Sequence, residues 1–318
     1  FGILIMKEHF LDFERPLAEI IEKIEALQAA SNEDPELLGQ IEKLRKEEEK
    51  LKNKIFSKLS TWQKVQVARH PQRPHTSDYI KAVFSDFIEL HGDRQFADDQ
   101  SIIGGIAEIE GNSVMVIGHE KGRETEDKVK RNFGMPQPEG YRKAKRLMQL
   151  AERFNLPVIT FIDTAGAYPG IEGEERGQSE AIATNLAVMS KLRTPIIVII
   201  TGEGGSGGAL AIGVGDHIAI LEHATYSVAS PEACASIIWR TAEKASDAAE
   251  AMKVSAQELI KIKIVDEIIK EPLGGAHRDY KEISESVRSC ILKNLGTLLS
   301  KPIDDLLEAR YKKLLEIG

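Results

Sequence analysis

A glycine-rich segment, Thr194 to Gly215, carries the clearest chemical signal in the sequence. It opens with the apolar run Ile196 to Ile200, places five glycines from Gly202 to Gly208, and ends in a short apolar stretch before Gly213. The pattern predicts a buried strand, a tight turn and the start of a helix. Because glycine has no Cβ, such a turn lets backbone N–H groups approach a ligand closely.

The dinucleotide-binding fingerprint is one template that fits this segment. Gly202, Gly204 and Gly207 have the G-x-G-x-x-G spacing, and Glu222 follows at the distance expected for a ribose-binding acid. The fingerprint is followed by a longer helix than the stretch before Gly213 allows. That mismatch disfavours a dinucleotide site.

The nucleophile elbow of serine hydrolases is a second template. Residues 204–208 read G-x-S-x-G with Ser206 in the nucleophile position. Such an enzyme needs a histidine base, and His217, His223 and His277 occur later without a spacing that selects one. Ser206 is also an ordinary small turn residue, so a stand-alone serine hydrolase or peptidase stays open as an alternative function.

A second loop, Asp163 to Gly170, follows the apolar run 157–162. Its D-x-x-G opening resembles a GTPase motif, but the sequence has no G-x-x-x-x-G-K-[ST] phosphate loop, which excludes that interpretation. The remaining interpretation of the glycine turn is a backbone oxyanion hole, in which successive N–H groups stabilise negative charge on a carbonyl oxygen. Such a site needs no side-chain chemistry, in keeping with a turn that has no Lys, Cys or His.

The composition excludes several other classes of protein. A formal net charge of −8 argues against general nucleic-acid binding. No window has the roughly 18 apolar residues of a membrane span, and the apolar start before Met6 is too short for a signal peptide. Cys234 and Cys290 are far apart and lack C-x-x-C spacing, so we expect no metal in this chain and a reducing, cytoplasmic location.

The N-terminal part predicts a helical hairpin. Apolar residues recur at helical spacing over residues 12–60, with a break at Ser31 to Pro35. The proline-bounded segment His70 to His75 is predicted to be a linker, followed by a helix through Leu90. We therefore expect two domains, an N-terminal helical region with its linker at 7–75 and an α/β domain at 76–318.

Strands and helices are expected to alternate in the second domain. The strands are expected at 102–109 and 113–118, joined by a turn at Gly111-Asn112, and at 157–162, 196–200, 217–221, 225–228 and 264–268. Helices are expected at 172–192, from about Pro231, at 279–299 and at 303–316. This alternation indicates a mainly parallel sheet with right-handed crossovers.

The stretch from Glu120 to Arg146 is strongly basic. It is either a solvated loop and helix or a patch that binds phosphates of a ligand or an acidic partner surface. The candidates for such contacts are Lys121, Arg123, Arg131 and Arg142.

Long sequence motifs cover most of the glycine-rich segment, the loop at Asp163 to Gly170 and most of the basic stretch, and they follow one another over roughly residues 69–277. They are HPQRP, GDR-x-x-ADD, GHEKGRET, RNFGMPQPEGYRKA-x-RLM, FIDTAGAYPG, EERGQSEAIA, GEGGSGGALAIGVGD, SPE-x-CASI and EPLGGAH. Together they closely resemble the carboxyltransferase alpha subunits of multisubunit bacterial acetyl-CoA carboxylases. The resemblance covers essentially the whole chain after Met6. One departure is Ala165, where many members of that family carry proline.

The resemblance implies a crotonase-like α/β fold, a spiral of ββα units, with an N-terminal helical hairpin. It implies an enzyme that is active only with a homologous beta subunit carrying zinc, two of each forming the carboxyltransferase. The reaction moves a carboxyl group from carboxybiotin on a separate carrier protein to acetyl-CoA and gives malonyl-CoA, the first step of fatty acid synthesis. A biotin carboxylase completes the implied complex.

The resemblance also implies the site residues. The backbone N–H groups of Gly207 and Gly208 would stabilise the ureido oxygen of biotin. The surrounding carboxybiotin site would be formed by Gly204, Gly205, Ser206, Gly166, Ala167 and Tyr168. A second oxyanion hole, on the beta subunit, would stabilise the enolate of acetyl-CoA. The biotin nitrogen would accept the methyl proton, so no protein base is required.

Overall fold

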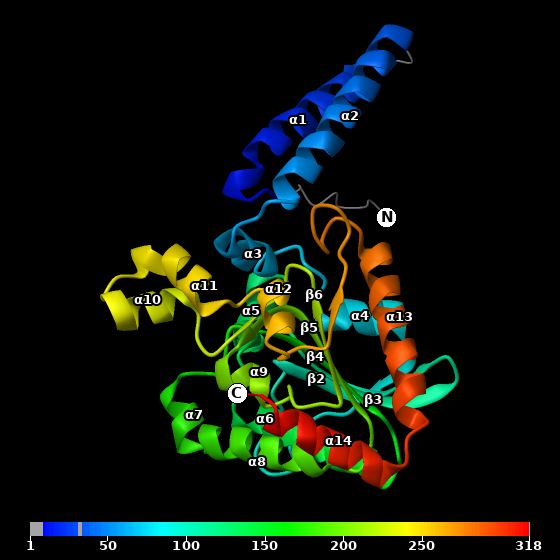
Figure 1. Ribbon diagram of the computed structural model, residues 1–318, viewed down its shortest axis with the longest axis vertical. Helices are drawn as coiled ribbons and strands as arrows, with labels where there is room; N and C mark the ends of the chain where they lie inside the picture. The colour runs from blue at the N-terminus through cyan, green and yellow to red at the C-terminus, as the bar shows by residue number, and fades with distance from the viewer. Residues whose placement is uncertain (1–8, 31–33, 318) are drawn as a thin grey trace.

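The structure is a computed structural model that describes residues 9–30 and 34–317. The start of the chain through residue 8, including Met6, and three residues of the predicted break, 31–33, lie outside the described residues. A mixed eight-stranded sheet forms the centre, with strand order β1-β2-β3-β4-β5-β6-β8 and β7 paired to β5. Helices cover both faces of the sheet, as Figure 1 shows.

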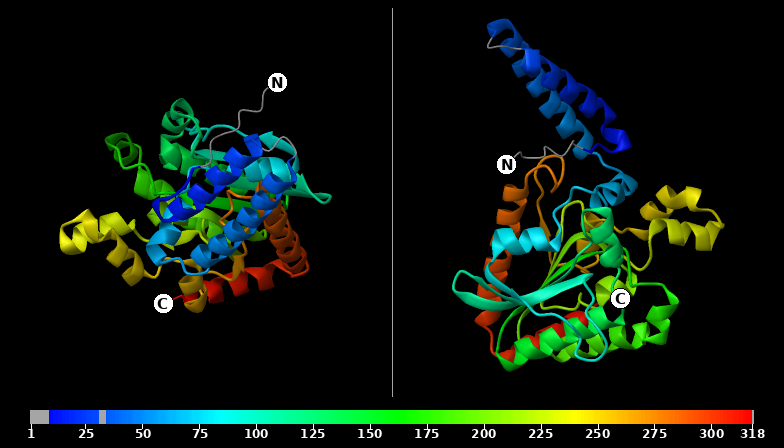
Figure 2. Two further views of the ribbon diagram at one scale, coloured as in Figure 1. Left: turned by 90° about the horizontal axis from the view of Figure 1, so that it is seen from above. Right: turned by 180° about the vertical axis from the view of Figure 1, so that it is seen from behind.

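The predicted N-terminal hairpin is confirmed. After a short 3₁₀ turn, η1 (Asp12–Glu14), it consists of α1 (Arg15–Ala30) and α2 (Pro35–Phe56), and it projects from the rest of the chain in Figures 1 and 2. Asp34 caps α2 by accepting a 2.9 Å hydrogen bond from the backbone N–H of Glu36. Ile20, Ile24 and Ile41 form the apolar seam between the two helices.

A further helix, α3 (Thr61–Ala68), lies between the hairpin and the linker. It packs against α11 (Ala245–Met252), with Val65 in a buried cluster with Ala249 and Val254. The segment before the linker is therefore anchored on the main body. The division at 7–75 and 76–318 stays a prediction.

The helix predicted to run to Leu90 is shorter than expected. It ends as α4 (Thr76–Val83), and β1 (Ser85–Glu89) then pairs antiparallel with β2. Residues 85–89 thus form a strand at the edge of the sheet. Phe84, just before them, packs edge-on against Phe161 of β4. Local spacing could not show this pairing, because β2 lies later in the chain.

The sheet combines an antiparallel and a parallel half. The strands β2 (Ile102–Ile109) and β3 (Asn112–His119) form a hairpin whose turn is Glu110-Gly111, one residue earlier than predicted, with both residues at positive φ. The parallel strands are β4 (Val158–Thr164), β5 (Ile196–Gly205), β6 (His217–Leu221) and β8 (Glu267–Ile269), and the short β7 (Thr225–Ser227) pairs with the end of β5.

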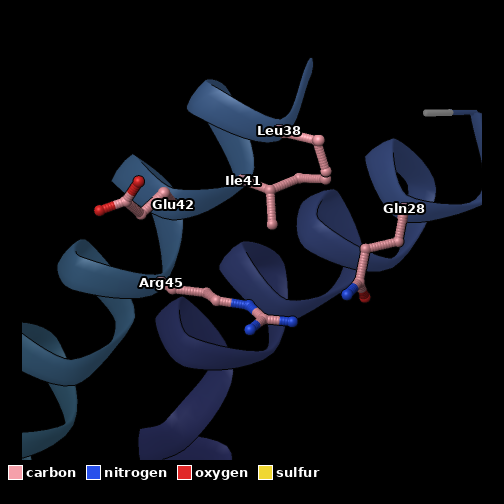
Figure 3. Close-up of a pocket in the computed structure, with 5 residues that line it drawn as sticks. All are labelled: Gln28, Leu38, Ile41, Glu42 and Arg45. Carbon is pink, nitrogen blue, oxygen red and sulfur yellow. The ribbon is translucent and has the colours of Figure 1, made fainter. Parts of the chain in front are cut away.

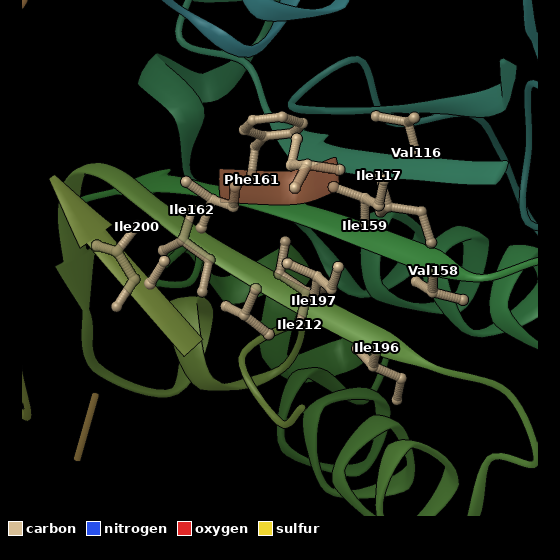
Figure 4. Close-up of a cluster of buried hydrophobic side chains, with 14 of the residues drawn as sticks. Val116, Ile117, Val158, Ile159, Phe161, Ile162, Ile196, Ile197, Ile200 and Ile212 are labelled. Atoms are coloured by element: carbon tan, nitrogen blue, oxygen red, sulfur yellow. The ribbon is translucent and has the colours of Figure 1, made fainter. Parts of the chain in front are cut away.

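The parallel strands form the core because both of their faces are buried. Figure 4 shows their apolar side chains, with Phe161 on one face of the sheet, and the Phe161 ring stacks on Tyr79 of α4 at 5.6 Å. Each fully buried Ile or Val contributes about 1.5–3 kcal/mol to folding. The helix α6 (Pro138–Arg153) packs on β2 and β3, and α13 (Tyr280–Leu299) packs beside α4.

The predicted helix 172–192 is two helices, α7 (Ile171–Glu175) and α8 (Gln178–Lys191). Gly177 separates them at φ 81°. The other helices are α5 (Thr125–Lys130), α10 (Pro231–Trp239), α12 (Ala256–Lys261) and α14 (Ile303–Leu315), with 3₁₀ turns η2 (Asn132–Gly134) and η3 (Ala242–Lys244). The strand expected at 264–268 is β8, three residues long and shifted toward the C-terminus.

Glu120 anchors the linker to the end of β3 and predicts a pH effect. Its carboxylate accepts from the His75 ring at 3.0 Å and from the Ser77 N–H at 2.9 Å. Burial alone raises the pKa of Glu120, but these partners lower it to about 2. This stabilisation, roughly 3 kcal/mol, is complete above about pH 4.5 and is lost as the pH falls toward 2.

Urea unfolding between pH 7 and pH 3 tests this prediction. Glu120→Gln should flatten the loss of stability below pH 4.5, whereas the exposed Glu243→Gln should leave the pH dependence unchanged. Equal pH slopes for wild type and Glu120→Gln would contradict the assignment.

Candidate active site at the glycine turn

The turn in the glycine segment is shorter than predicted, because most of the glycines lie in a strand. The strand β5 continues through Gly205, and α9 (Ser206–Leu210) begins at the next residue. The extension arises because the β4–β5 register shifts after Ile162, so that Thr164 pairs with Gly204, while β7 pairs with the other side of the strand. The turn itself is therefore short and held on both sides.

Three glycines of this strand are required by packing. A Cβ at Gly202 would overlap the Asp163 carboxylate, one at Gly204 the Tyr226 ring, and one at Gly205 the backbone of Ala165. These glycines let the loop after β4 and the strand β7 lie directly against β5. The fold alone explains their presence.

Gly207 and Gly208 differ in what surrounds them. A Cβ at Gly208 would lie 2.5 Å from the carbonyl carbon of Gly166, so the fold requires glycine there. A Cβ at Gly207 would meet only the Ile182 side chain, at an ordinary 3.6 Å. Within the described ranges, neither of the two N–H groups donates a hydrogen bond. The turn thus presents two backbone donors, one of them on a glycine that internal packing does not demand.

Ser206 is exposed and adopts a positive φ of 53°. No hydrogen bond among the described residues joins it to a histidine. His217 begins β6 at the opposite end of the sheet, His223 lies beside Phe56, and His277 stacks on His70 at 3.7 Å. The geometry gives the serine hydrolase alternative no support, because a serine nucleophile needs a base within hydrogen-bond reach.

The second predicted loop lies partly against the turn. Gly166 and Ala167 contact Gly208, and the Thr164 hydroxyl shapes their bend by donating to the Gly166 carbonyl at 2.8 Å. Tyr168 instead folds over its own loop, with its ring against Gly170. The structure therefore brings Gly166 and Ala167, but not the Tyr168 ring, to the glycine turn.

The cavities of the described residues include three of about 420, 560 and 470 Å³, and the last of these lies beside Asn155 and Leu299, away from the glycine turn. The largest of the three, about 560 Å³, opens beside Gly207 and is lined mainly by apolar side chains, among them Leu210, Tyr226, Val228 and Ile262. The smallest, shown in Figure 3, lies between α1 and α2 of the projecting hairpin, beside Gln28 and Ile41. Of these three, only the largest adjoins the glycine turn.

The four candidate basic residues are already paired inside the chain. Lys121 lies 2.6 Å from Asp163, Arg131 2.6 Å from Asp127, and Arg142 2.8 Å from Asp93, while Arg123 pairs with Asp78. Each of the four charges therefore has a carboxylate partner within the chain. Contact with a phosphate or a partner stays a prediction for these residues.

Several residues beside the turn were not identified from the sequence. The most buried is His119, which ends β3 next to the backbone of Gly208 and Phe161. Burial lowers the pKa of His119 to about 4, against the opposing effects of the Asp163 carboxylate and the Gly208 backbone. Asp163, Glu203 and Arg69 also lie here. Their signal in the sequence was only their place within the long motifs quoted above.

One cluster of potential metal ligands was also missed. His217, Glu267 and Cys290 have ligand atoms within 4.8 Å of one another. Glu267 already accepts from Lys293 and Asn294, and burial raises the pKa of the Cys290 thiol to about 12, which disfavours the thiolate that a metal needs. The cluster lies at the opposite end of the sheet from the glycine turn.

Curated relatives match nearly the full length of the chain. The alpha subunit of acetyl-coenzyme A carboxylase carboxyl transferase from Vibrio cholerae is 59% identical over 98% of this chain and 99% of its own. The subunit of the same name from Pseudomonas aeruginosa is 57% identical, again over 98% and 99%. A helix that could cross a membrane does not occur among residues 9–30 and 34–317.

Solved structures share the fold at low sequence identity. The transcarboxylase 12S core superposes with a TM-score of 0.60 at 18% identity, covering 72% of this chain and 42% of the other. A Pseudomonas malonate decarboxylase hetero-tetramer gives 0.58 at 17%, covering 73% and 90%. The chain spans less than half the length of the 12S chain.

These neighbours confirm the crotonase-like α/β fold that the resemblance implied. The sequence profile described as acetyl co-enzyme A carboxylase carboxyltransferase-like matches residues 10–318. With relatives of that kind at 57–59% identity over almost every residue, the chain belongs to the acetyl-CoA carboxylase carboxyltransferase family.

Proposed function

We propose that this chain is the alpha half of a two-subunit carboxyltransferase. With a beta subunit it transfers the carboxyl group of carboxybiotin, held on a carrier protein, to acetyl-CoA and gives malonyl-CoA for fatty acid synthesis. The observation that carries the proposal is Gly207, a glycine with room for a Cβ inside the chain but with its N–H beside an open apolar cavity. Glycine at such a position is explained by the close approach of a ligand.

The N–H groups of Gly207 and Gly208 are proposed as an oxyanion hole. When bound, carboxybiotin supplies the carboxyl group, and charge develops on its ureido oxygen as that group leaves. The two unused donors would stabilise this charge, each contributing about 100- to 1000-fold in rate. Gly204, Gly205 and the loop at Gly166 set the turn in place by direct backbone packing.

The residues around the turn fit a bicyclic, largely apolar group. The cavity beside Gly207 has a volume of about 560 Å³ and mostly apolar walls, which suit a group of this kind. Ser206 lines its mouth, and Ala167 lies behind Gly208. Tyr168 would join this site only if its ring left Gly170.

A beta subunit is proposed to cover this face. Val228, beside the cavity, is 84% exposed, and on α10 Ile237 and Ile238 are 77% and 60% exposed. Figures 1 and 2 show α10 projecting from the body beyond α11. Exposed apolar side chains at the rim of a site are typical of a protein interface. Two alpha and two beta subunits, with zinc and most of the CoA on beta, complete the proposed enzyme.

The remaining partners follow from the same family. A biotin carboxylase would recharge the carrier, and the complex is proposed to work in the cytoplasm. Arg123 and Arg131 keep 32% and 24% of their side-chain surface exposed, so a CoA phosphate or an acidic partner can still reach them. The side chain of Arg142 is 9% exposed and is the least accessible of the candidates.

Reconstitution tests the proposed function. The purified chain alone is expected to form no malonyl-CoA, and activity should appear on mixing with a zinc-containing beta subunit that co-purifies with it. Robust carboxylation by the chain alone would contradict the two-subunit proposal. Covalent labelling of Ser206 by a fluorophosphonate would revive the hydrolase alternative.

A further inference from the structure

Three cations grip β5 immediately before the glycine turn. Arg73, from the linker, donates twice to the Thr201 carbonyl, at 3.0 and 2.8 Å. Arg69 pairs with Glu203 at 2.5 Å, and Lys121 lies 3.5 Å from the same carboxylate. Each of the three cations is more than 80 residues away in sequence from the residue of β5 that it contacts. Tertiary contacts therefore hold this end of the strand in place.

Asp163 is the centre of this arrangement. Its Oδ1 accepts the Glu203 backbone N–H at 3.0 Å and lies 2.6 Å from the Lys121 ammonium. The same carboxylate fills the space that a side chain at Gly202 would need. Asp163 also directly precedes the segment on which Gly205 and Gly208 pack. A single buried carboxylate therefore ties together both walls of the turn.

The charges at this position are balanced. Burial lowers the pKa of Lys121, but Asp163 and Glu203 outweigh it and raise the pKa, so the ammonium stays protonated. Glu203 is shared between Lys121 and Arg69, and Arg69 has a second partner in Glu232 at 2.5 Å. The positive charges of Lys121 and Arg69 are therefore matched by neighbouring carboxylates, and neither cation is left unpaired to attract the proposed ligand.

We propose that Asp163 and Lys121 form a positioning pair that holds β5 in the register at which the Gly207 and Gly208 N–H groups meet the reacting oxygen. The inference rests on the proposed oxyanion hole. Neither side chain needs to touch substrate, because each acts through the backbone of residues 202–203. A displacement of the turn by about 1 Å is enough to cost about 100-fold in rate.

The other end of β5 offers a matched control. Asp216 accepts the Ile196 N–H at 2.7 Å and pairs with the buried Arg310 at 2.7 Å. Its chemistry is thus that of Asp163, a backbone N–H of the same strand plus a buried cation. It lies at the end of the strand that is remote from the glycine turn.

Asp163→Asn and Asp216→Asn, each in the reconstituted complex with beta, test the proposal. Both should lower the melting temperature. Asp163→Asn should also lower kcat about 100-fold with the KM for acetyl-CoA unchanged, whereas Asp216→Asn should leave kcat within about twofold of wild type. A kcat for Asp163→Asn equal to that of Asp216→Asn would overturn the proposal.

A pH profile separates positioning from a general loss of stability. Lys121→Met leaves the Asp163 and Glu203 carboxylates facing each other without the ammonium that contacts both, so the two negative charges repel. Its kcat relative to wild type should therefore rise as the pH falls, because a proton replaces the missing ammonium. A ratio that stays flat with pH, as expected for Asp216→Asn, would count against the pair.

Two further variants keep the outcomes distinct. If Asp163→Asn does not assemble with beta, Lys121→Gln keeps a polar side chain beside Asp163 but removes the positive charge, and it should lower kcat about tenfold; unchanged kcat there refutes the positioning role. Gly207→Ala tests the oxyanion hole itself. Loss of activity in Gly207→Ala together with full activity in Asp163→Asn would refute the positioning role of Asp163 and Lys121 but would support the oxyanion hole.

Discussion

Replacing Gly207 by valine is expected to lower malonyl-CoA formation by the alpha–beta complex at least about 100-fold, at little cost to folding. The Cβ at this position meets only Ile182, at 3.6 Å, so the chain can accept a side chain. Because Gly207 lines the cavity, we expect the added methyl groups to crowd the N–H groups and to keep the reacting oxygen away from them. Steady-state kinetics and thermal unfolding of the same complex measure the two effects.

Two glycines provide the comparison. Gly296, in α13, has open space where its Cβ would be, so Gly296→Val should leave activity unchanged. Gly208→Ala should fail differently, with lost stability as well as lost activity, because its Cβ would lie 2.5 Å from the Gly166 carbonyl carbon. A Gly207→Val complex that assembles normally and keeps full activity would refute the oxyanion-hole assignment.

Arg73→Met is expected to lower the free energy of unfolding by about 3–5 kcal/mol. Arg73 pairs with Glu271 at 2.6 Å, and the two side chains are 2% and 0% exposed. Removing the guanidinium leaves a buried, unpaired carboxylate and an unsatisfied Thr201 carbonyl. Chemical denaturation of the chain measures the loss.

A surface pair and a double variant control for this prediction. Arg193 pairs with Asp304 at the surface, with side chains 51% and 81% exposed, so Arg193→Met should cost less than about 1 kcal/mol. Adding Glu271→Gln to Arg73→Met should recover part of the loss, because the unpaired buried charge is then removed. A loss for Arg73→Met no larger than that for Arg193→Met would show that the buried pair does not stabilise the fold.

Local signals predicted much of the architecture correctly. The hairpin of α1 and α2, the strands β2 to β6 and the C-terminal helices follow from apolar periodicity, turn residues and caps, which act over a few residues. The prediction failed where a distant segment decided the outcome. Residues 85–89 join the sheet because β2 offers an unpaired edge, and Gly177 divides the helix expected at 172–192.

The basic stretch from Glu120 to Arg146 shows that the pairing of charges, too, could not be predicted from the sequence. Its composition left open whether the cations are solvated or contact a phosphate or a partner, and it did not show that Lys121 and Arg142 lie in ion pairs with Asp163 and Asp93. The sequence separation of these partners is about 40–50 residues. Which carboxylate faces which cation depends on how strands and loops are stacked, and composition carries no information about that.

The glycine turn shows most clearly what the sequence determined and what the tertiary structure decided. By itself the sequence determined a strand, a turn without side chains and a helix start, and its long motifs determined the family. Only the tertiary structure decided what each glycine is for. At Gly202, Gly204, Gly205 and Gly208 a Cβ would overlap other parts of the chain, whereas at Gly207 it would make only an ordinary contact with Ile182. The reason is physical, because a missing Cβ has meaning only in relation to the atoms that would occupy its place, and the fold brings those atoms from Asp163, Ala165 and Tyr226.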